Sequence, residues 1–160
     1  MTTIKFAKLD QNIHMPTRKH LTDAGIDLYA QVIDEFDSEY VYNSPDRVPV
    51  EPFNFRIIKT GLLVEIPEGH FGWITNKSSK DYLIGGGIID EGYQGELLVK
   101  VINYLPTKIY IKHHEPIAQL LIIPCKILDI EIADLSEIHQ KQTARKDTGG
   151  IAKQLEFEVI

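Results

Sequence analysis

Glycine and proline turn signals divide the apolar sequence roughly every 8–12 residues, and this spacing is typical of an all-β sandwich or barrel. The signals stand at Pro67, Gly69, Gly85–Gly87, Gly92, Pro106, Pro116 and Pro124. Two segments, 108–112 and 128–132, alternate apolar and polar residues, which is the pattern of a half-buried strand. No segment keeps a helical apolar stripe over three turns. The sequence therefore predicts a single all-β domain.

The predicted strands are short runs rich in β-branched and aromatic residues. They are Ile4–Leu9, Ile26–Ala30, Phe55–Thr60, Leu62–Ile66, Phe71–Thr75, Glu96–Asn103, Lys108–His113, Ile117–Ile123 and Lys126–Ile132. The acidic, proline-containing stretch Gln31–Pro52 is predicted as a long surface connection with room for one strand, and Ser136–Gln142 as a short helix. We expect a β domain over residues 1–138 and a tail over 139–160, in which Leu155–Ile160 alternates like a closing strand.

Composition and charge exclude several classes of protein. The length of 160 residues fits one domain. With 17 Lys and Arg against 23 Asp and Glu, the net charge is −6, which argues against a nucleic-acid polymer as partner but leaves a nucleotide substrate open. The single cysteine, Cys125, excludes a disulfide framework and is expected in the core, as is Trp73. Because no apolar run approaches the ~20 residues that span a bilayer, and the N-terminus lacks a signal-peptide core, we expect a soluble, cytoplasmic protein with no membrane partner.

Four segments carry polar residues that suit a binding or catalytic site. In 22–28, Gly25 permits an unusual backbone angle between Asp23 and Asp27. In 75–80, serine hydroxyls, lysine ammonium groups and backbone N–H groups make a plausible anion cradle. Taken alone, the first segment is also explained by a capped turn, and the second by an ordinary polar loop.

The third segment, 85–96, is the most distinctive of the four. Its three consecutive glycines let the backbone approach a ligand closely, and Asp90 follows directly on an apolar pair. Tyr93 comes three residues later, so an aromatic ring stands next to a carboxylate. The alternative is a decorated β-hairpin without a site. In the fourth segment, 116–124, the amide of Gln119 interrupts an apolar strand and is either a structural bridge or a ligand contact.

One known family has these motifs in this order. The chain resembles the trimeric dUTPases, the dUTP nucleotidohydrolase family, in the motifs DAGIDL, NKSSK, GGIIDEGYQGE and PIAQL, with Asn103 behind the third, over about residues 3–151. The resemblance implies a distorted jelly-roll or β-barrel-like subunit of the β-clip type, a homotrimer, and active sites at the subunit interfaces. It also implies an enzyme, a dUTP diphosphatase that cleaves dUTP to dUMP and pyrophosphate. The implied cofactor is Mg²⁺, held mainly by the substrate phosphates and with no direct protein ligand.

The resemblance also implies roles for individual residues. Asp90 matches the carboxylate that activates the attacking water, and Tyr93 matches the aromatic residue beneath the deoxyribose. Asp27 matches the motif-one aspartate, which holds the site together and assists the metal–water network. Lys77 stands where the family usually has a phosphate-binding arginine, and it keeps the charge but lacks the bidentate fork. The substrate-binding positions implied in this way are Lys77, Ser78, Ser79, Gly87, Ile88, Ile89, Tyr93, Gln119, Arg145, Lys146, Gly149 and Gly150.

Besides Lys77, the chain departs from the family pattern at two further places. The stretch Ser79–Gly87 is several residues shorter than usual, which bears on base selectivity. In the glycine-rich lid, Ile151 replaces the Phe that covers uracil, and the chain continues beyond it. Two alternatives therefore stay open: a non-catalytic nucleotide-binding or regulatory protein with the same fold, and an enzyme related to the dCTP deaminases. Deamination itself is disfavoured, because Lys100 stands where the deaminases have a general-base Glu.

Overall fold

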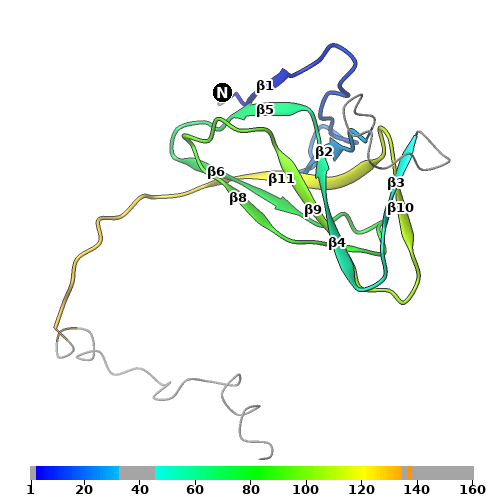
Figure 1. Ribbon diagram of the computed structural model, residues 1–160. Coiled ribbons are helices and arrows are strands. Elements are labelled where there is room, and N and C mark those ends of the chain that lie inside the picture. The colour runs from blue at the N-terminus through cyan, green and yellow to red at the C-terminus, as the bar shows by residue number, and fades with distance from the viewer. Residues whose placement is uncertain (1–2, 33–45, 135–136, 138–160) are drawn as a thin grey trace, which may run out of the picture. The chain divides into compact units, whose positions relative to one another are not determined.

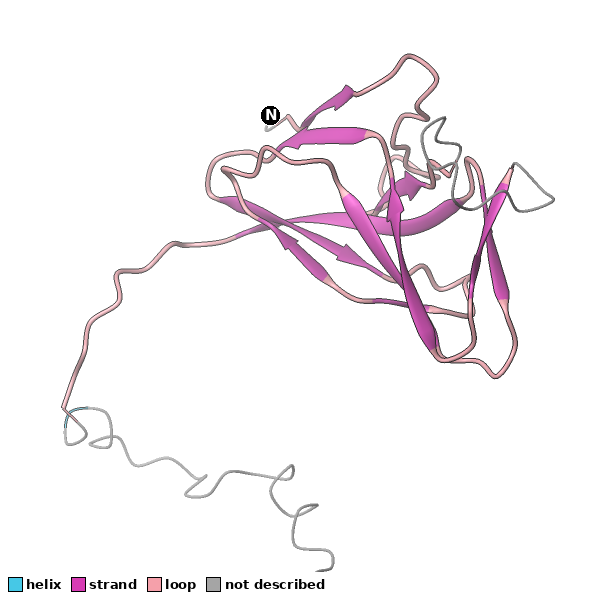
Figure 2. Cartoon of the chain, viewed as in Figure 1, coloured by secondary structure: helices cyan, strands magenta, loops and turns pink. Residues whose placement is uncertain are grey.

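The protein is described by a computed structural model that covers residues 3–32, 46–134 and 137. Eleven β-strands form within these ranges, and Figure 2 shows strands joined by loops and turns, which confirms the predicted all-β fold. The chain divides into two units, 1–127 and 128–160, and all eleven of these described strands belong to the first. No helix in the described ranges has the length and apolar character needed to cross a membrane.

The strands are short, and most end at a glycine, a proline or a polar turn. Their bounds are β1 (Lys5–Lys8), β2 (Ile26–Tyr29), β3 (Arg47–Val50), β4 (Asn54–Lys59), β5 (Leu62–Glu65), β6 (His70–Thr75), β7 (Leu83–Ile84), β8 (Gly87–Ile89), β9 (Leu98–Asn103), β10 (Ile109–Lys112) and β11 (Pro116–Pro124). Eight of the nine predicted strands form, with both ends within two residues of the expected positions.

The strands pair antiparallel in four sheets (Figure 1). The largest has the order β2-β11-β6-β8, and a three-stranded sheet has the order β4-β9-β7. Two smaller sheets pair β1 with β5 and β10 with β3. Along β9, exposed Leu98 and Lys100 alternate with buried Val99 and Val101, which is the period-two pattern of a strand with one face in the core.

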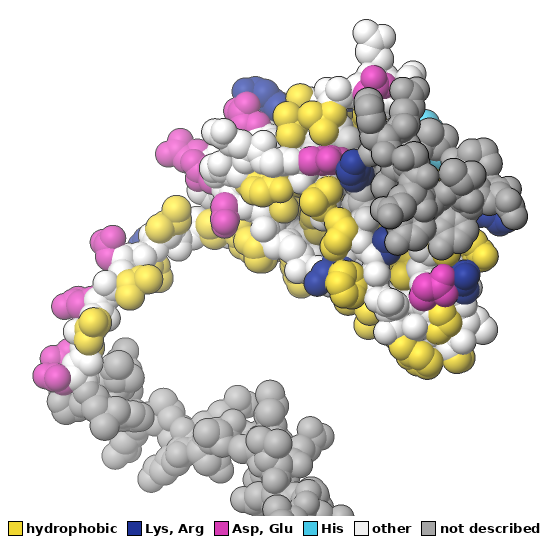
Figure 3. Space-filling view, in the orientation of Figure 1, with side chains coloured by type: hydrophobic (Ala, Val, Ile, Leu, Met, Phe, Trp, Pro, Cys, Tyr) yellow, Lys and Arg dark blue, Asp and Glu magenta, His cyan; other side chains and the backbone are white. Residues whose placement is uncertain are grey.

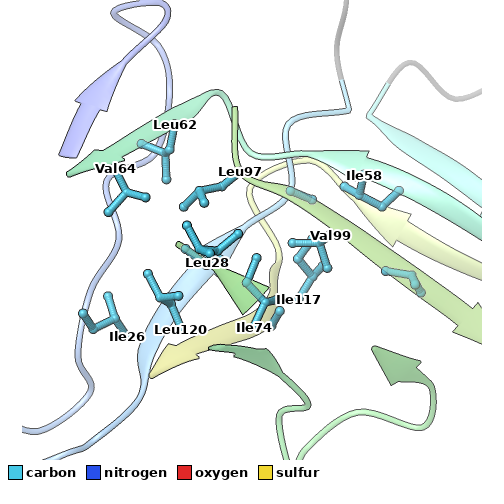
Figure 4. Packing of buried hydrophobic residues seen from close by; sticks show 14 of the residues in the cluster. Ile26, Leu28, Ile58, Leu62, Val64, Ile74, Leu97, Val99, Ile117 and Leu120 are labelled. Carbon is cyan, nitrogen blue, oxygen red and sulfur yellow. The ribbon is translucent and has the colours of Figure 1, made fainter. Parts of the chain in front are cut away.

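One hydrophobic core joins the two larger sheets. Figure 4 shows Ile74 of β6 and Ile117 of β11 packed together with Val99 of β9. Each fully buried aliphatic side chain contributes about 1.5–3 kcal/mol relative to an exposed one, so this cluster supplies most of the favourable free energy of folding. Because the core covers the inner face of each larger sheet, only the outer face is available for a site.

Asn103, the residue behind the third motif, is a buried polar group inside this framework. Its Nδ2 donates to the carbonyl oxygens of Val50, Glu51 and Thr107 at 3.0, 3.1 and 2.8 Å, and its Oδ1 accepts from the Leu105 N–H at 3.0 Å. Because all its hydrogen-bonding groups have partners, the amide joins the end of β9 to the β3–β4 connection without an unsatisfied polar atom.

Several sequence-based expectations are corrected by the structure. Lys126–Ile132 forms no strand, and Ile130 and Ile132 are 98% and 99% exposed. Figure 3 shows hydrophobic and acidic side chains alternating along this segment, as the sequence pattern indicates. An alternating segment becomes a strand only where the backbone edge of another strand supplies hydrogen bonds.

The two core assignments were also wrong. Trp73 is 42% exposed on the outer face of β6, and Cys125 is exposed just beyond β11. Two short strands, β7 and β8, were missed because they flank the glycines at 85 and 86 and are too short to show a period. The strand anticipated within Gln31–Pro52 is β3. The predicted helix Ser136–Gln142 and the predicted strand Leu155–Ile160 lie outside the described residues, apart from Glu137.

Candidate active site

The first and fourth motifs meet on the outer face of the four-stranded sheet. In the register of that sheet, Asp27 of β2 lies opposite Gln119 of β11, and Gln119 lies opposite Thr75 of β6. Directly opposed residues on neighbouring strands project from the same face of a sheet. The register of β2, β11 and β6 therefore builds a polar row from three motifs that are far apart in the sequence.

The second motif adds a cation to this row. The Lys77 ammonium group forms an ion pair with Oδ1 of Asp27, and the two side chains are only 18% and 19% exposed. Removing one partner of such a partly buried pair destabilises the folded protein, because the remaining charge is then left poorly solvated. Lys77 and Asp27 therefore position each other within the candidate site.

Asn76 fixes the loop that carries Lys77. Its Oδ1 accepts a hydrogen bond from the Ile84 N–H at 2.6 Å, and its backbone oxygen accepts one from Nε2 of Gln119, also at 2.6 Å. The loop is thus held to the end of β7 and to β11. Gln119 is confirmed as a structural bridge, which was one of the two roles expected for this amide.

Gly25 is needed for close packing and not for an unusual backbone angle. The positive-φ glycines among the described residues are Gly61 and Gly69, so the expectation for Gly25 was wrong. A Cβ atom at Gly25 would lie 2.1 Å from Oε1 of Gln119, which is far inside contact distance. The glycine of the first motif therefore makes room for the amide of the fourth motif.

These residues line a pocket of about 390 Å³. The lining is Lys19, Asp23, Ala24, Gly25, Asp27, Lys77, Gln119 and Leu121. Its two ammonium and two carboxylate groups suit a charged ligand, and its volume falls within the usual range for small-molecule sites. Ser78 and Ser79 lie on the exposed turn after Lys77 and do not belong to this lining.

The third motif does not contribute to the lining of this pocket. Asp90 follows β8 and is exposed, and its backbone oxygen accepts a hydrogen bond from the Tyr93 N–H at 3.1 Å. The Tyr93 hydroxyl donates to the backbone oxygen of Glu96 at 2.8 Å, and a Cβ atom at Gly95 would lie 2.5 Å from that hydroxyl. A compact turn therefore holds the Tyr93 ring in place while it leaves the Asp90 carboxylate in contact with solvent.

Tyr93 borders a second pocket, of about 640 Å³, between its own turn and strands β1 and β5. The two pockets share no lining residue. One chain therefore brings Asp27, Lys77 and Gln119 together but does not bring Asp90 and Tyr93 to them. Ile88, exposed, and Ile89, buried, lie on β8 with Gly87 at its start. Arg145, Lys146, Gly149 and Gly150 lie outside the described residues.

The structure also reveals site residues that the sequence reasoning did not single out. Lys19 lines the first pocket, and Lys80 forms a second ion pair, with Glu115, whose other carboxylate oxygen accepts the Lys112 N–H at 2.8 Å. The pKa of the nearby Tyr82 hydroxyl is raised far above its usual value, mainly by burial and to a lesser extent by the Glu115 charge. The sequence offers no local signal for the Lys80–Glu115 pair, because the partners are 35 residues apart.

Comparison with known proteins identifies the class. The family model for dUTPase matches residues 11–151, and the chain therefore belongs to the dUTPase family. The deoxyuridine 5'-triphosphate nucleotidohydrolase of Mycobacterium leprae is 31% identical over 156 residues, with 92% of each chain covered. The corresponding protein of Mycobacterium tuberculosis is 30% identical over the same length.

Solved structures give the same result. The dUTPase of Staphylococcus bacteriophage 80alpha, in a complex with dUpNHpp, superposes with a TM-score of 0.67 at 26% identity and covers 89% of this chain and 97% of its own. The dUTPase of phage phi11 of S. aureus gives a TM-score of 0.68 at 25% identity, covering 82% of this chain and 96% of its own. Both support the predicted dUTPase-like all-β fold.

Proposed function

We propose that this protein hydrolyses dUTP to dUMP and pyrophosphate. The observation that carries the proposal is the pocket in which the first, second and fourth motifs of the dUTPase resemblance converge, through Asp27, Lys77 and Gln119. Its paired charges and bridging amide form a rigid polar surface suited to phosphate groups. Membership of the dUTPase family then specifies the nucleotide.

In this proposal Asp90 acts as the general base. It accepts a proton from water while the water oxygen forms a bond to the α-phosphorus, and the bond from that phosphorus to the oxygen of the leaving pyrophosphate breaks. The exposed Asp90 carboxylate makes no hydrogen bond or ion pair within the described part of the chain, so it is available to a water molecule. Tyr93 packs against the deoxyribose, and the backbone around Ile88 and Ile89 binds the base.

The working enzyme is proposed to be a homotrimer, because a single chain separates the two groups of motif residues. One copy supplies Asp27, Lys77 and Gln119, and another supplies Asp90 and Tyr93. Exposed apolar surface supports an assembly of copies. The outer faces of β4 and β9 and the neighbouring β7 carry several large hydrophobic side chains, and contiguous exposed apolar surface usually marks an interface. The residues concerned are Phe55, Ile57, Leu83 and Leu98.

The donor set of the first pocket fits Mg²⁺ held largely by substrate phosphates. In proteins Mg²⁺ usually keeps several waters and is held by substrate phosphates beside one or two carboxylates, and Asp23 and Asp27 place two carboxylates in this pocket. Asp27 is paired with Lys77, and the described residues contain no group of three His, Cys, Asp or Glu that could hold a metal. When bound, the ion neutralises charge on the phosphates. A mutant of the phage phi11 dUTPase coordinates a structural Mg(II) ion.

Pyrophosphate release from dUTP, dCTP, dTTP and UTP, each with Mg²⁺ and with EDTA, tests the proposal. We expect release from dUTP alone and only with Mg²⁺. Absence of release from all four nucleotides would favour the non-catalytic alternative, and release from dCTP or dTTP would favour an enzyme for another deoxynucleotide. The roles of Arg145, Lys146, Gly149 and Gly150, the division at residue 138 and the cytoplasmic location remain predictions.

A further inference from the structure

The first pocket contains a second lysine that belongs to none of the four motifs. Lys19 lines the same pocket as Asp27, Lys77 and Gln119, and its side chain is exposed. It comes from the loop that precedes Gly25. The pocket therefore has cations from two separate loops.

The Lys19 loop is fixed on both sides of the lysine. On one side, the Asp27 N–H donates to the Thr17 carbonyl oxygen at 2.7 Å, and the Thr17 N–H donates to the Asp27 carbonyl oxygen at 3.3 Å. On the other side, Oδ2 of Asp23 accepts from the His20 N–H at 2.9 Å, and the Asp23 N–H donates to the His20 oxygen at 3.1 Å. The backbone of Lys19 is therefore held beside the strand that carries Asp27.

The two lysines differ in how their charge is used. Lys77 is already neutralised by Asp27 in a partly buried ion pair. Lys19 makes no hydrogen bond or ion pair among the residues that the structure describes, so all three of its N–H donors are available. An anion entering the pocket can therefore form a charge-assisted hydrogen bond with Lys19 without separating an existing pair.

We infer that Lys19 is a further phosphate-binding residue of this pocket, and that it contacts the di- or triphosphate part of the ligand. The identity of the nucleotide rests on the proposed function, whereas the contact itself depends only on the phosphate chain. Lys77 then acts mainly by holding Asp27 and the loop of the second motif in place, and Lys19 provides the ammonium group that binds the phosphate chain.

Calorimetric binding of inorganic tripolyphosphate, at one fixed salt concentration, tests this inference on the full chain. The variants are Lys19→Met, which removes the charge but keeps most of the side chain, and Lys19→Arg, which keeps the charge. Lys112→Met is the matched control, because Lys112 is an exposed lysine of β10 that lines neither pocket. We expect the Kd to rise about tenfold for Lys19→Met, to change less than about threefold for Lys19→Arg, and to be unchanged for the control.

Steady-state hydrolysis of dUTP by the same proteins separates this inference from the proposed function. We expect Lys19→Met to raise KM with little change in kcat, since the contact is made with the bound ligand as well as in the transition state. Native affinity for tripolyphosphate in a folded Lys19→Met protein, or an equal loss in Lys112→Met, would overturn the inference even if dUTP is hydrolysed. Conversely, a selective loss of tripolyphosphate binding in a protein that does not hydrolyse dUTP would support the Lys19 contact and refute the proposed function.

Discussion

The two groups of motif residues differ in how they are held. Asp27, Lys77 and Gln119 are tied together by strand register, an ion pair and a bridging amide, and they are largely shielded from water. Asp90, in contrast, is exposed on a turn. The first group is thus built like a structural element, and the second leaves a reactive carboxylate free. Substitutions in the first group should therefore change both stability and binding, whereas a substitution of Asp90 should change only the rate.

The largest effect is expected for Asp90→Asn. Loss of a general base lowers kcat by ~10²–10⁴, and the isosteric amide preserves the shape of the turn. The melting temperature and the affinity for dUTP should stay close to native, because the Asp90 side chain is exposed. Steady-state kinetics and thermal unfolding measure both quantities. A near-native kcat would move the role of base to another carboxylate, with Asp27 the first to test.

Truncation after His139 is expected to have the next largest effect. It removes Arg145, Lys146, Gly149 and Gly150, which the family resemblance places in a lid over the phosphates. Loss of an oriented cation of this kind lowers kcat by ~10²–10³. The melting temperature should stay native, since the core lies in the strands of residues 1–127. A truncated protein with full activity would contradict the lid, and a lower melting temperature with native kcat would assign the tail a structural role.

The Lys77–Asp27 pair allows a direct test of the structural character of the first group. Lys77→Met leaves the Asp27 carboxylate partly buried without its partner, and we expect a loss of about 1–3 kcal/mol in the free energy of unfolding. Combining it with Asp27→Asn removes the orphaned charge and should recover part of that loss. A double-mutant cycle measured by urea unfolding gives the coupling energy. Additive effects would show that the pair contributes nothing to stability.

The Lys80–Glu115 pair should have a smaller effect that reaches the site indirectly. It joins the loop of the second motif to the turn before β11, so Lys80→Met should loosen that loop and raise KM a few-fold. The charge-exchanged double variant Lys80→Glu with Glu115→Lys should recover part of the loss, although Glu115 also accepts the Lys112 N–H. Lys112→Met is the control, because it alters a nearby charge without breaking the pair. Equal KM values for all variants would remove Lys80 from the set of positioning residues.

The comparison also shows what the sequence could predict. Period-two alternation and turn residues are local signals, and they placed eight strands correctly. These local signals do not indicate which face of a strand the rest of the fold buries. For this reason Trp73 is predicted in the core, although it is exposed in the structure. The motifs indicated Asp27, Lys77 and Gln119 individually. Their contacts, and the tight fit of Gly25 against Gln119, depend on strand pairing across long sequence separations and became visible only in the structure.

The smallest effect is expected for Ile151→Phe. This substitution tests whether the tail lies over the base near Tyr93 or over Lys77 and Asp27. If the tail covers the base held near Tyr93, an aromatic ring at 151 should improve dUTP binding by about 0.5–1.5 kcal/mol through stacking, and Ile151→Ala should change it only slightly. The phosphate group offers no flat apolar partner, so a tail that closes only over Lys77 and Asp27 gains nothing from the ring. Binding of dUMP and of tripolyphosphate, measured side by side, distinguishes these cases: tighter binding of dUMP alone places residue 151 over the base. Unchanged binding of both ligands by Ile151→Phe would show that residue 151 does not reach the nucleotide. The proposed contacts of the tail would then be Arg145, Lys146, Gly149 and Gly150.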